Sequence, residues 1–323
     1  MLEKKFLSMP KIDLHCHLDG SMTQKSIIDI LGRDVALSEV QVSDDCTSLA
    51  EYLSKFDVMM ECIQTEDGLK KAAKEFLLGL QSDNVKYVEA RFAPALSINQ
   101  GLSNKQIMEA VLDGLKEASA ECGIMYQVIA CCMRHHSEET NMAMLKECRE
   151  FLGEGLCAVD LAGDEAGFPT NKFYNLFEYA RQVEYPFTIH SGECGDVNNI
   201  LLAAEWGAKR IGHGIAMMGN EEVMKVVADK RMGVEMCPIS NYQTKALAPD
   251  GVYPIREFAK AGILATINTD NRLVSNTSIT KEMEFLNKQF GIAEEELLQY
   301  QKNAIEVAFC DEFTKHELWK LYR

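Results

Sequence analysis

Six short segments spread along the chain carry residues that suit metal binding or proton transfer. Each segment follows an apolar, strand-like run, and the six are residues 15–20, 160–165, 190–193, 210–214, 235–238 and 268–271. Polar groups that converge at strand ends from a whole chain are typical of the C-terminal face of a (β/α)8 barrel. The pattern therefore predicts an active site at the mouth of such a barrel.

Metal binding is the first chemistry that these residues suggest. His15 and His17 are two residues apart on an expected strand, so their side chains share one face. His190 and Asp270 add nitrogen and oxygen donors that Zn²⁺ accepts. A lone His-x-His pair is a weak signal because structural histidines share that spacing, but four donors at strand ends favour a metal. The fourth run ends at residues 160–163 with no lysine that could bridge two metals, so we expect one zinc ion per chain.

Glu193 and His213 are the candidates for proton transfer. Glu193 lies three residues past His190, where it could act as a general acid or base beside a metal. His213 lies between Gly212 and Gly214, which allow a ligand or backbone to approach closely. It could be a fifth metal ligand, or a free imidazole that orients and deprotonates a water. Taken singly, a surface ion pair and a core histidine would explain these two residues equally well.

The six segments together resemble the adenosine deaminase family of the amidohydrolase superfamily. The resemblance covers nearly the whole chain and keeps the order of the motifs, which are highly specific when taken together. The family motifs HxHLDG, DLAGDE, HxGE, GHG, CPxSN and NTD are matched at residues 15–20, 160–165, 190–193, 212–214, 237–241 and 268–270.

The resemblance implies a set of catalytic and metal-binding roles. The implied zinc ligands are His15, His17, His190 and Asp270. Glu193 would donate a proton to purine N1, while His213 and Asp270 would position the water that zinc activates. Asp160 and Ser240 would support these groups from behind, although a purely structural role explains them at least as well.

The resemblance also implies a set of substrate contacts. His17 is one of them, and Asp19 would accept a hydrogen bond from a ribose hydroxyl. The backbone N–H of Gly163 would donate to purine N3. Leu53 and Phe56 would cover the purine from a helical insertion.

Residues 271 and 272 depart from the family's usual NTDDP. The second aspartate of that motif must be protonated to donate to purine N7, whereas Asn271 has a permanent NH2 donor for the same contact. The change leaves the base specificity less certain. Arg272 could contact a phosphate, but an ion pair at the rim is the favoured interpretation.

The elements that must position these residues follow a regular order. Eight β-rich runs are expected at residues 12–18, 85–93, 124–133, 156–162, 186–191, 209–213, 232–237 and 263–269. They are continuous rather than alternating, as expected for parallel strands buried on both faces. Helical spacing of apolar residues is expected at 104–122, 197–206, 221–230 and 254–261. Gly123 is placed to end the first of these helices. This alternation predicts an α/β (β/α)8 barrel.

Two regions exceed a minimal barrel. Residues 21–80 form a helical insertion after the first strand, and residues 280–322 read as further helices packed on the barrel's outside. An apolar stripe in the insertion consists of Tyr52, Phe56, Met59, Met60 and Ile63. A core-facing helix side is the favoured interpretation of the stripe, and an apolar lid over the barrel mouth is the alternative. No repeat or linker divides the chain, so we expect residues 1–323 to form one domain.

Composition limits the partners and the compartment. A formal charge of −16 argues against nucleic acid or an anionic membrane as a partner, and mildly against a phosphorylated substrate. The chain has 11 cysteines and no CxxC pair, which favours reduced thiols over disulfides. No run is long enough for a transmembrane helix and no signal peptide is evident, so a cytoplasmic protein is expected. We expect a monomer or a weak homo-oligomer.

The expected function is zinc-dependent hydrolysis of adenosine to inosine and ammonia, with 2′-deoxyadenosine as a second substrate. The alternative within the same chemistry is a deaminase of adenine, adenosine monophosphate or an N6-substituted adenosine. A catalytically silent nucleoside-binding barrel is the alternative from a different class. The presence of both Glu193 and His213 argues against the silent barrel.

Overall fold

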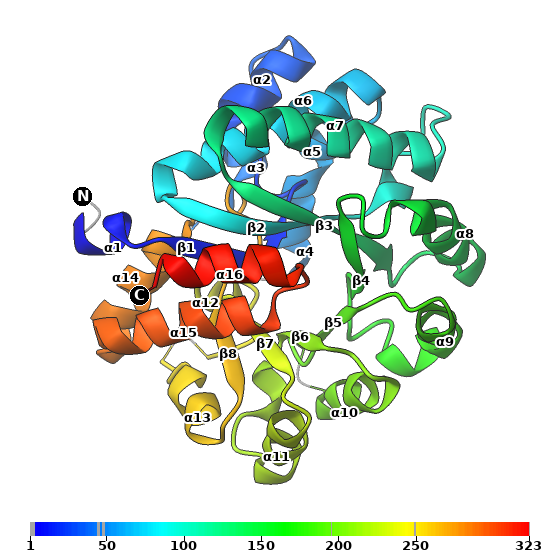
Figure 1. The fold of residues 1–323 in the computed structure, drawn as a ribbon. Helices are drawn as coiled ribbons and strands as arrows, with labels where there is room; N and C mark the ends of the chain where they lie inside the picture. The colour runs from blue at the N-terminus through cyan, green and yellow to red at the C-terminus, as the bar shows by residue number, and fades with distance from the viewer. Residues whose placement is uncertain (1–3, 44–45, 47–48, 195, 249, 323) are drawn as a thin grey trace.

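Eight parallel strands form the centre of the molecule, with helices around them (Figure 1). The computed structural model describes residues 4–322 except 44, 45, 47, 48, 195 and 249. The strands are β1 (Lys11–His17), β2 (Val85–Phe92), β3 (Met125–Met133), β4 (Leu156–Ala162), β5 (Thr188–Ser191), β6 (Arg210–His213), β7 (Gly233–Met236) and β8 (Leu264–Ile267). Each overlaps one of the eight expected runs, so the predicted (β/α)8 barrel is confirmed.

The strands pair in sequence order as β1-β2-β3-β4 and β5-β6-β7-β8, and parallel bridges join these two sheets. Val159 of β4 forms a bridge with Phe187, which directly precedes β5. Cys16 of β1 forms a bridge with Asp270, which follows β8. At the second seam the Asp270 N–H also donates to the carbonyl oxygen of His15 at 2.7 Å. The seam that closes the barrel therefore carries two of the predicted metal ligands.

The outer helices follow the strands; all except α8 and α9, which the sequence analysis did not single out, match the expected helical patterns. They are α7 (Asn104–Cys122), α8 (Glu138–Cys148), α9 (Tyr174–Gln182), α10 (Val197–Trp206), α11 (Glu221–Asp229), α13 (Ile255–Lys260), α14 (Ile279–Phe290) and α15 (Glu294–Val307). Ser103 and Gln106 form a capping box at the start of α7. Gly123 ends that helix as predicted, with a left-handed φ of 73° that favours glycine.

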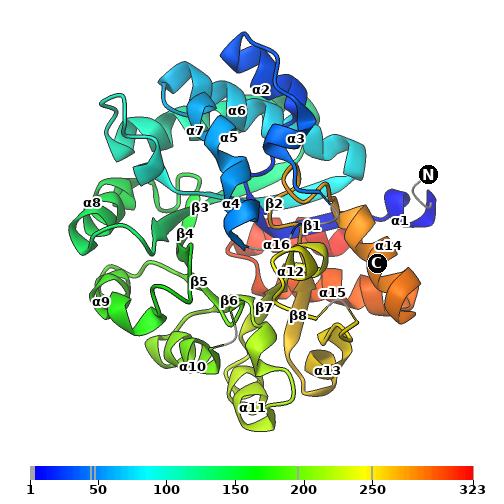
Figure 2. The same cartoon turned by 180° about the vertical axis from the view of Figure 1, so that it is seen from behind.

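Part of the helical insertion between β1 and β2 covers one end of the barrel, and the rest lies at its side next to α7. Its helices are α2 (Gln24–Leu31), α3 (Leu37–Val40), α4 (Leu49–Leu53), α5 (Asp57–Cys62) and α6 (Glu66–Gly79). Figure 2 shows α4 over the strand ends, together with the short α12 (Pro238–Gln243). Both interpretations of the apolar stripe hold for part of it. Met59 and Ile63 are buried in the core, as a core-facing side requires, whereas Phe56 and Met60 line a cavity, as a lid would.

The expected C-terminal helices are present, and one of them covers an end of the barrel. α16 (Glu312–Lys320) lies across the end of the barrel opposite α4 and α12 (Figures 1 and 2). Its Leu318 joins a buried cluster with Ile12 and Leu14 of β1. The sequence did not predict which part of the barrel α16 covers, because Leu318 is its one buried side chain and forms no apolar pattern along the helix.

Two further observations bear on the sequence expectations. The 11 cysteines are all free thiols, and most are buried. Among the described residues, none of the helices combines the length and the apolarity needed to cross a membrane. The division into a single domain stays a prediction.

Candidate active site

A cavity of about 310 Å³ opens at the C-terminal ends of the strands, within the size range of small-molecule pockets. All the predicted catalytic, metal-binding and substrate-contact residues except His15 line it, and His15 is fully buried beside it. The cavity therefore collects the residues that the sequence placed at successive strand ends.

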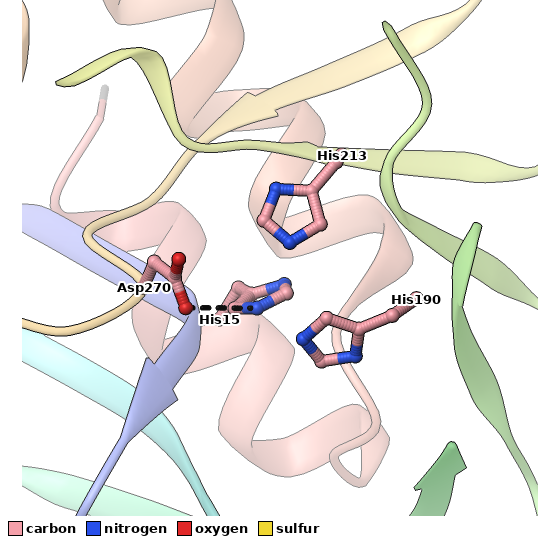
Figure 3. A group of neighbouring side chains, drawn as sticks. All are labelled: His15, His190, His213 and Asp270. Carbon is pink, nitrogen blue, oxygen red and sulfur yellow. Dashed lines mark ion pairs between the residues drawn. The ribbon is translucent and has the colours of Figure 1, made fainter. Parts of the chain in front are cut away.

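Donor atoms converge at the floor of this cavity. One potential ligand atom from each of His15, His190, His213 and Asp270 lies within 4.8 Å of the other three (Figure 3). His17 lies outside this set but adjoins it, because its Nε2 is 3.2 Å from Nε2 of His190 and 3.4 Å from Oδ1 of Asp270. Nε2 of His15 is 3.5 Å from the same Asp270 oxygen.

These distances fit a metal ion. Zinc–nitrogen bonds of about 2.0–2.1 Å place tetrahedral ligand atoms roughly 3.3–3.4 Å apart, close to the separations observed here. Nε2 of His15 is buried without a hydrogen-bond partner among the described residues. A buried, unpaired ring nitrogen is costly unless it meets a ligand. The donor atoms of His15, His17, His190 and Asp270 are therefore placed where they could hold a metal ion.

Carboxylates behind two of the histidines fix their orientation. Nδ1 of His15 lies 2.8 Å from Glu235, and Nδ1 of His190 lies 2.8 Å from Asp160. A carboxylate on Nδ1 keeps the proton there, so the Nε2 lone pair faces the centre of the site. Burial would raise the pKa of Asp160, but His190 and Arg91 outweigh it and hold the pKa well below its usual value.

Buried arginines hold these carboxylates in turn. Arg91 donates to Asp160 at 3.0 Å and to Glu235 at 2.8 Å, and Arg210 donates to Glu235 at 2.5 Å. Arg210 also pairs with Glu89, and all five side chains are buried. This layer of charges inside the barrel was missed in the sequence, although arginines and glutamates within apolar strands are a signal that could have revealed it.

Two neighbours hold the carboxylate of Asp270. Its Oδ2 accepts from Ser240 at 2.6 Å and its Oδ1 accepts from Asn271 at 2.7 Å. Burial raises its pKa, but His15 and the other histidines outweigh burial, so the carboxylate stays ionised. Its backbone has a left-handed φ of 60°, as does that of His213 at 66°. Such conformations in residues other than glycine cluster at functional sites.

Glu193 lies on the loop after β5, and a second glutamate fixes that loop. The Glu165 carboxylate accepts from the backbone N–H groups of Gly192, Glu193 and Cys194 at 2.7, 3.0 and 3.1 Å. It also accepts from the Asn199 amide at 2.8 Å. The side chain of Glu193 remains 15% exposed and reaches within 3.7 Å of His213 Nε2. Sequence reasoning quoted Glu165 within a motif but gave it no role.

Glycines make room for His15 beside His213. A Cβ at Gly212 would lie 3.1 Å from the His15 ring, and one at Gly214 would lie 2.9 Å from Val234. Gly214 also has a left-handed φ of 69°. The GHG motif thus lets the His213 backbone pass close to the metal ligands.

The predicted substrate contacts lie on the cavity walls. Asp19 is buried, its Oδ1 has no hydrogen-bond partner among the described residues, and burial raises its pKa to about 7. Gly163 has a φ of 103°, which favours glycine at this position. Phe56 is half-buried in the wall, while Leu53 is 43% exposed at the rim.

Asn271 and Arg272 occupy different surroundings. Asn271 is 4% exposed and lines the cavity, and a Cβ at Gly20 would overlap its Oδ1 at 1.9 Å. Arg272 pairs with Asp83 at 3.2 Å and does not line the cavity. The ion-pair interpretation of Arg272 is therefore confirmed, with Asp83 buried and Arg272 partly buried.

Comparison with known proteins agrees with this geometry. The adenosine deaminase family model matches residues 10–321. The chain is 42% identical over 325 residues to an adenosine deaminase from Clostridium botulinum, with 97% of each chain covered. An Arabidopsis N6-mAMP deaminase has a similar fold, with a TM-score of 0.88, 24% identity and 99% of each chain covered. An amidohydrolase from Burkholderia ambifaria with bound Zn has a TM-score of 0.86 at 21% identity, covering 98% of this chain and 90% of that one. This chain belongs to the adenosine deaminase family.

Proposed function

We propose that this chain hydrolyses adenosine, and also 2′-deoxyadenosine, to inosine and ammonia with one zinc ion per chain. The observation that carries the proposal is that His15, His190, His213 and Asp270 converge at the floor of one cavity. Glu193 lines the same cavity. Family membership over residues 10–321 supports the same reaction.

The proposed zinc ligands are His15, His17, His190 and Asp270. When bound there, zinc would lower the pKa of a coordinated water toward neutrality and so supply a nucleophile at pH 7. The paired carboxylates behind His15 and His190 keep the ligand nitrogens unprotonated and correctly aimed. Ser240 and Asn271 hold the two oxygens of Asp270.

Glu193 would make the purine reactive. The adenine ring resists attack at C6 because it is aromatic, and a proton delivered to N1 makes C6 electrophilic. Glu193 must therefore carry a proton when the purine is bound. The bonds from Glu165 to three consecutive backbone N–H groups fix the loop that presents this acid. His213 and Asp270 would position the attacking water.

The charge of the cavity supports a nucleoside over a nucleotide. Four carboxylates line it, those of Asp19, Asp164, Glu193 and Asp270, and none of the described lining residues is a lysine or an arginine. With Asp270 bound to the zinc ion and Glu193 protonated, the carboxylates of Asp19 and Asp164 remain to repel a phosphate at the part of the cavity away from the metal. The unpaired oxygen of Asp19 suits a sugar hydroxyl, which supports adenosine over free adenine.

The same reasoning sets the expected partners. We propose that the ligand is a small purine nucleoside, and that the chain binds neither nucleic acid nor membranes because of its charge of −16. Its free thiols suit a cytoplasmic location. We propose a monomer or a weak homo-oligomer.

A substrate panel tests the proposal. Zinc-loaded protein is incubated with adenosine, 2′-deoxyadenosine, adenine, adenosine monophosphate and N6-methyl adenosine monophosphate, and ammonia release is measured for each. We expect kcat/KM for both nucleosides to exceed that for each monophosphate and for adenine by at least roughly 10²-fold, because the wrong substrates leave Asp19 unpaired or repelled. A monophosphate as the best substrate would overturn the proposal. Tight binding of adenosine without ammonia release would instead support the silent barrel.

A further inference from the structure

Three buried histidines at the site differ in what they meet at Nδ1. His15 and His190 each have a carboxylate there, at 2.8 Å in both cases. His213 has the side-chain amide nitrogen of Asn241, at 3.0 Å. An amide NH2 can only donate, so Nδ1 of His213 must accept.

The orientation of the Asn241 amide is fixed by a tyrosine. Tyr253 donates its hydroxyl hydrogen to Oδ1 of Asn241 at 2.9 Å, which turns the NH2 group toward His213. Burial raises the pKa of the Tyr253 phenol well above its usual value, so the hydrogen stays in place. Asn241 is fully buried and Tyr253 is 2% exposed, so water does not compete for these bonds. If the amide were reversed, the Tyr253 hydroxyl would have to accept from the NH2 group, and Nδ1 of His213 would have to carry the hydrogen.

The hydrogen bond at Nδ1 determines the protonation of the other ring nitrogen of His213, Nε2. With Nδ1 accepting, a neutral His213 carries its hydrogen on Nε2. This Nε2 is buried with no hydrogen-bond partner among the described residues, and the His213 side chain lines the cavity. His213 therefore presents an N–H to the cavity, whereas His15 and His190 present lone pairs.

We infer that Asn241 and Tyr253 are positioning residues that hold His213 in the tautomer with hydrogen on Nε2. In this tautomer His213 is a hydrogen-bond donor to the attacking water and is not a fifth metal ligand. Building on the proposed function, the donor holds the water oxygen so that its lone pair faces purine C6. The tautomer itself does not depend on which substrate is used.

The first test reads the tautomer directly. The chain has 7 histidines, so nitrogen NMR of zinc-loaded protein labelled with ¹⁵N-histidine gives few signals, and comparison with His213→Gln identifies the signal of His213. We expect a protonated Nε2 and an unprotonated Nδ1. Hydrogen on Nδ1 would overturn the inference. Because this readout needs no turnover, a protein that fails to deaminate adenosine would refute the proposed function and leave the tautomer result standing.

The second test replaces the donor by an acceptor. In Asn241→Asp the new carboxylate would accept from Nδ1, as Glu235 does for His15, so the Nε2 signal should move and kcat should fall roughly 10²- to 10⁴-fold. Zinc content should stay at one per chain, and KM should change less than about threefold because the substrate contacts remain. A normal kcat with a shifted tautomer, or an equal loss with an unshifted tautomer, would contradict the inference.

Matched variants separate positioning from simple destabilisation. Asn303→Asp makes the same change in a buried amide, one that donates to the Ala265 carbonyl at 2.9 Å outside the cavity. It should lower the Tm and leave kcat unchanged. Tyr253→Phe frees the amide of Asn241 with little change in volume, so kcat should fall roughly 3- to 10-fold, the equivalent of one hydrogen bond. If Asn241→Asp does not fold, a normal kcat in Tyr253→Phe would overturn the role of the pair.

Discussion

Asn271, where the chain leaves the family pattern, has two tasks in the proposed site. One amide hydrogen bonds Oδ1 of Asp270 at 2.7 Å, which leaves the second hydrogen free for purine N7. The side chain is 4% exposed and lines the cavity, so both bonds would be shielded from water. Asn271→Ala should therefore affect both the metal ligand and the substrate.

The two effects have different magnitudes and different readouts. Loss of a partner that supports a metal ligand typically weakens metal binding 10- to 100-fold. A stranded N7 acceptor costs roughly 1–3 kcal/mol, which is about 5- to 150-fold in kcat/KM for adenosine. Excess zinc removes the first effect, so the second can be measured alone. Asn271→Asp should remain active only where the new carboxyl keeps a proton, because it faces the ionised Asp270, and its activity should fall as pH rises.

The assay compares adenosine with 7-deazaadenosine, which lacks N7, at saturating zinc. The wild-type protein already lacks the N7 bond with the analogue, so Asn271→Ala should cost at least about 5-fold less on the analogue than on adenosine. Equal fractional losses on both substrates would refute the N7 contact. Unchanged zinc affinity would refute the support of Asp270.

Three more variants and one control test the site and the stability of the fold. Glu193→Gln should keep zinc and lose roughly 10²–10⁴ in kcat, because only the proton donor is removed; near-normal kcat in a preparation with full zinc would show that the role is assigned wrongly. Glu165→Gln turns an NH2 group toward backbone donors, so kcat should fall about 10-fold or more with little change in KM. Glu147→Gln is its control, because that exposed carboxylate accepts from the backbone N–H of Asn104 away from the cavity and should affect stability alone. Burial raises the pKa of Glu282 to about 8, so between about pH 4.3 and pH 8 the folded chain holds a proton that the unfolded chain has released. The free energy of unfolding therefore falls as pH rises through this range. Glu282→Gln should thus raise the Tm at pH 8 more than at pH 5, and parallel Tm curves would argue against it.

Local sequence patterns predicted the strands and the residues at their ends. A parallel strand buried on both faces is a continuous apolar run, so all eight could be found from the sequence. The site residues follow such runs directly, and the (β/α)8 architecture brings them together without knowledge of any tertiary contact. That is why His17, Glu193 and Asn271 line one cavity as expected.

Partners from distant strands could not be predicted in the same way. The role of Arg91 depends on Asp160 and Glu235, which are 69 and 144 residues away, and no local pattern pairs them. Glu165 reaches the Glu193 backbone across 28 residues, and its function appears only when the two loops meet. The sequence likewise could not decide whether His213 is a metal ligand or a free imidazole, because that depends on which side chain contacts its Nδ1.

Stepwise zinc addition to metal-free protein, with adenosine turnover followed at each step, tests the proposed function most directly. The proposed site predicts inosine and ammonia in equal amounts, with a rate that rises linearly to one zinc per chain and then stays constant. His15→Ala should show no rise over the same range because a ligand is missing. A rate that needs two equivalents, or zinc binding without any ammonia release, would contradict a mononuclear adenosine deaminase site.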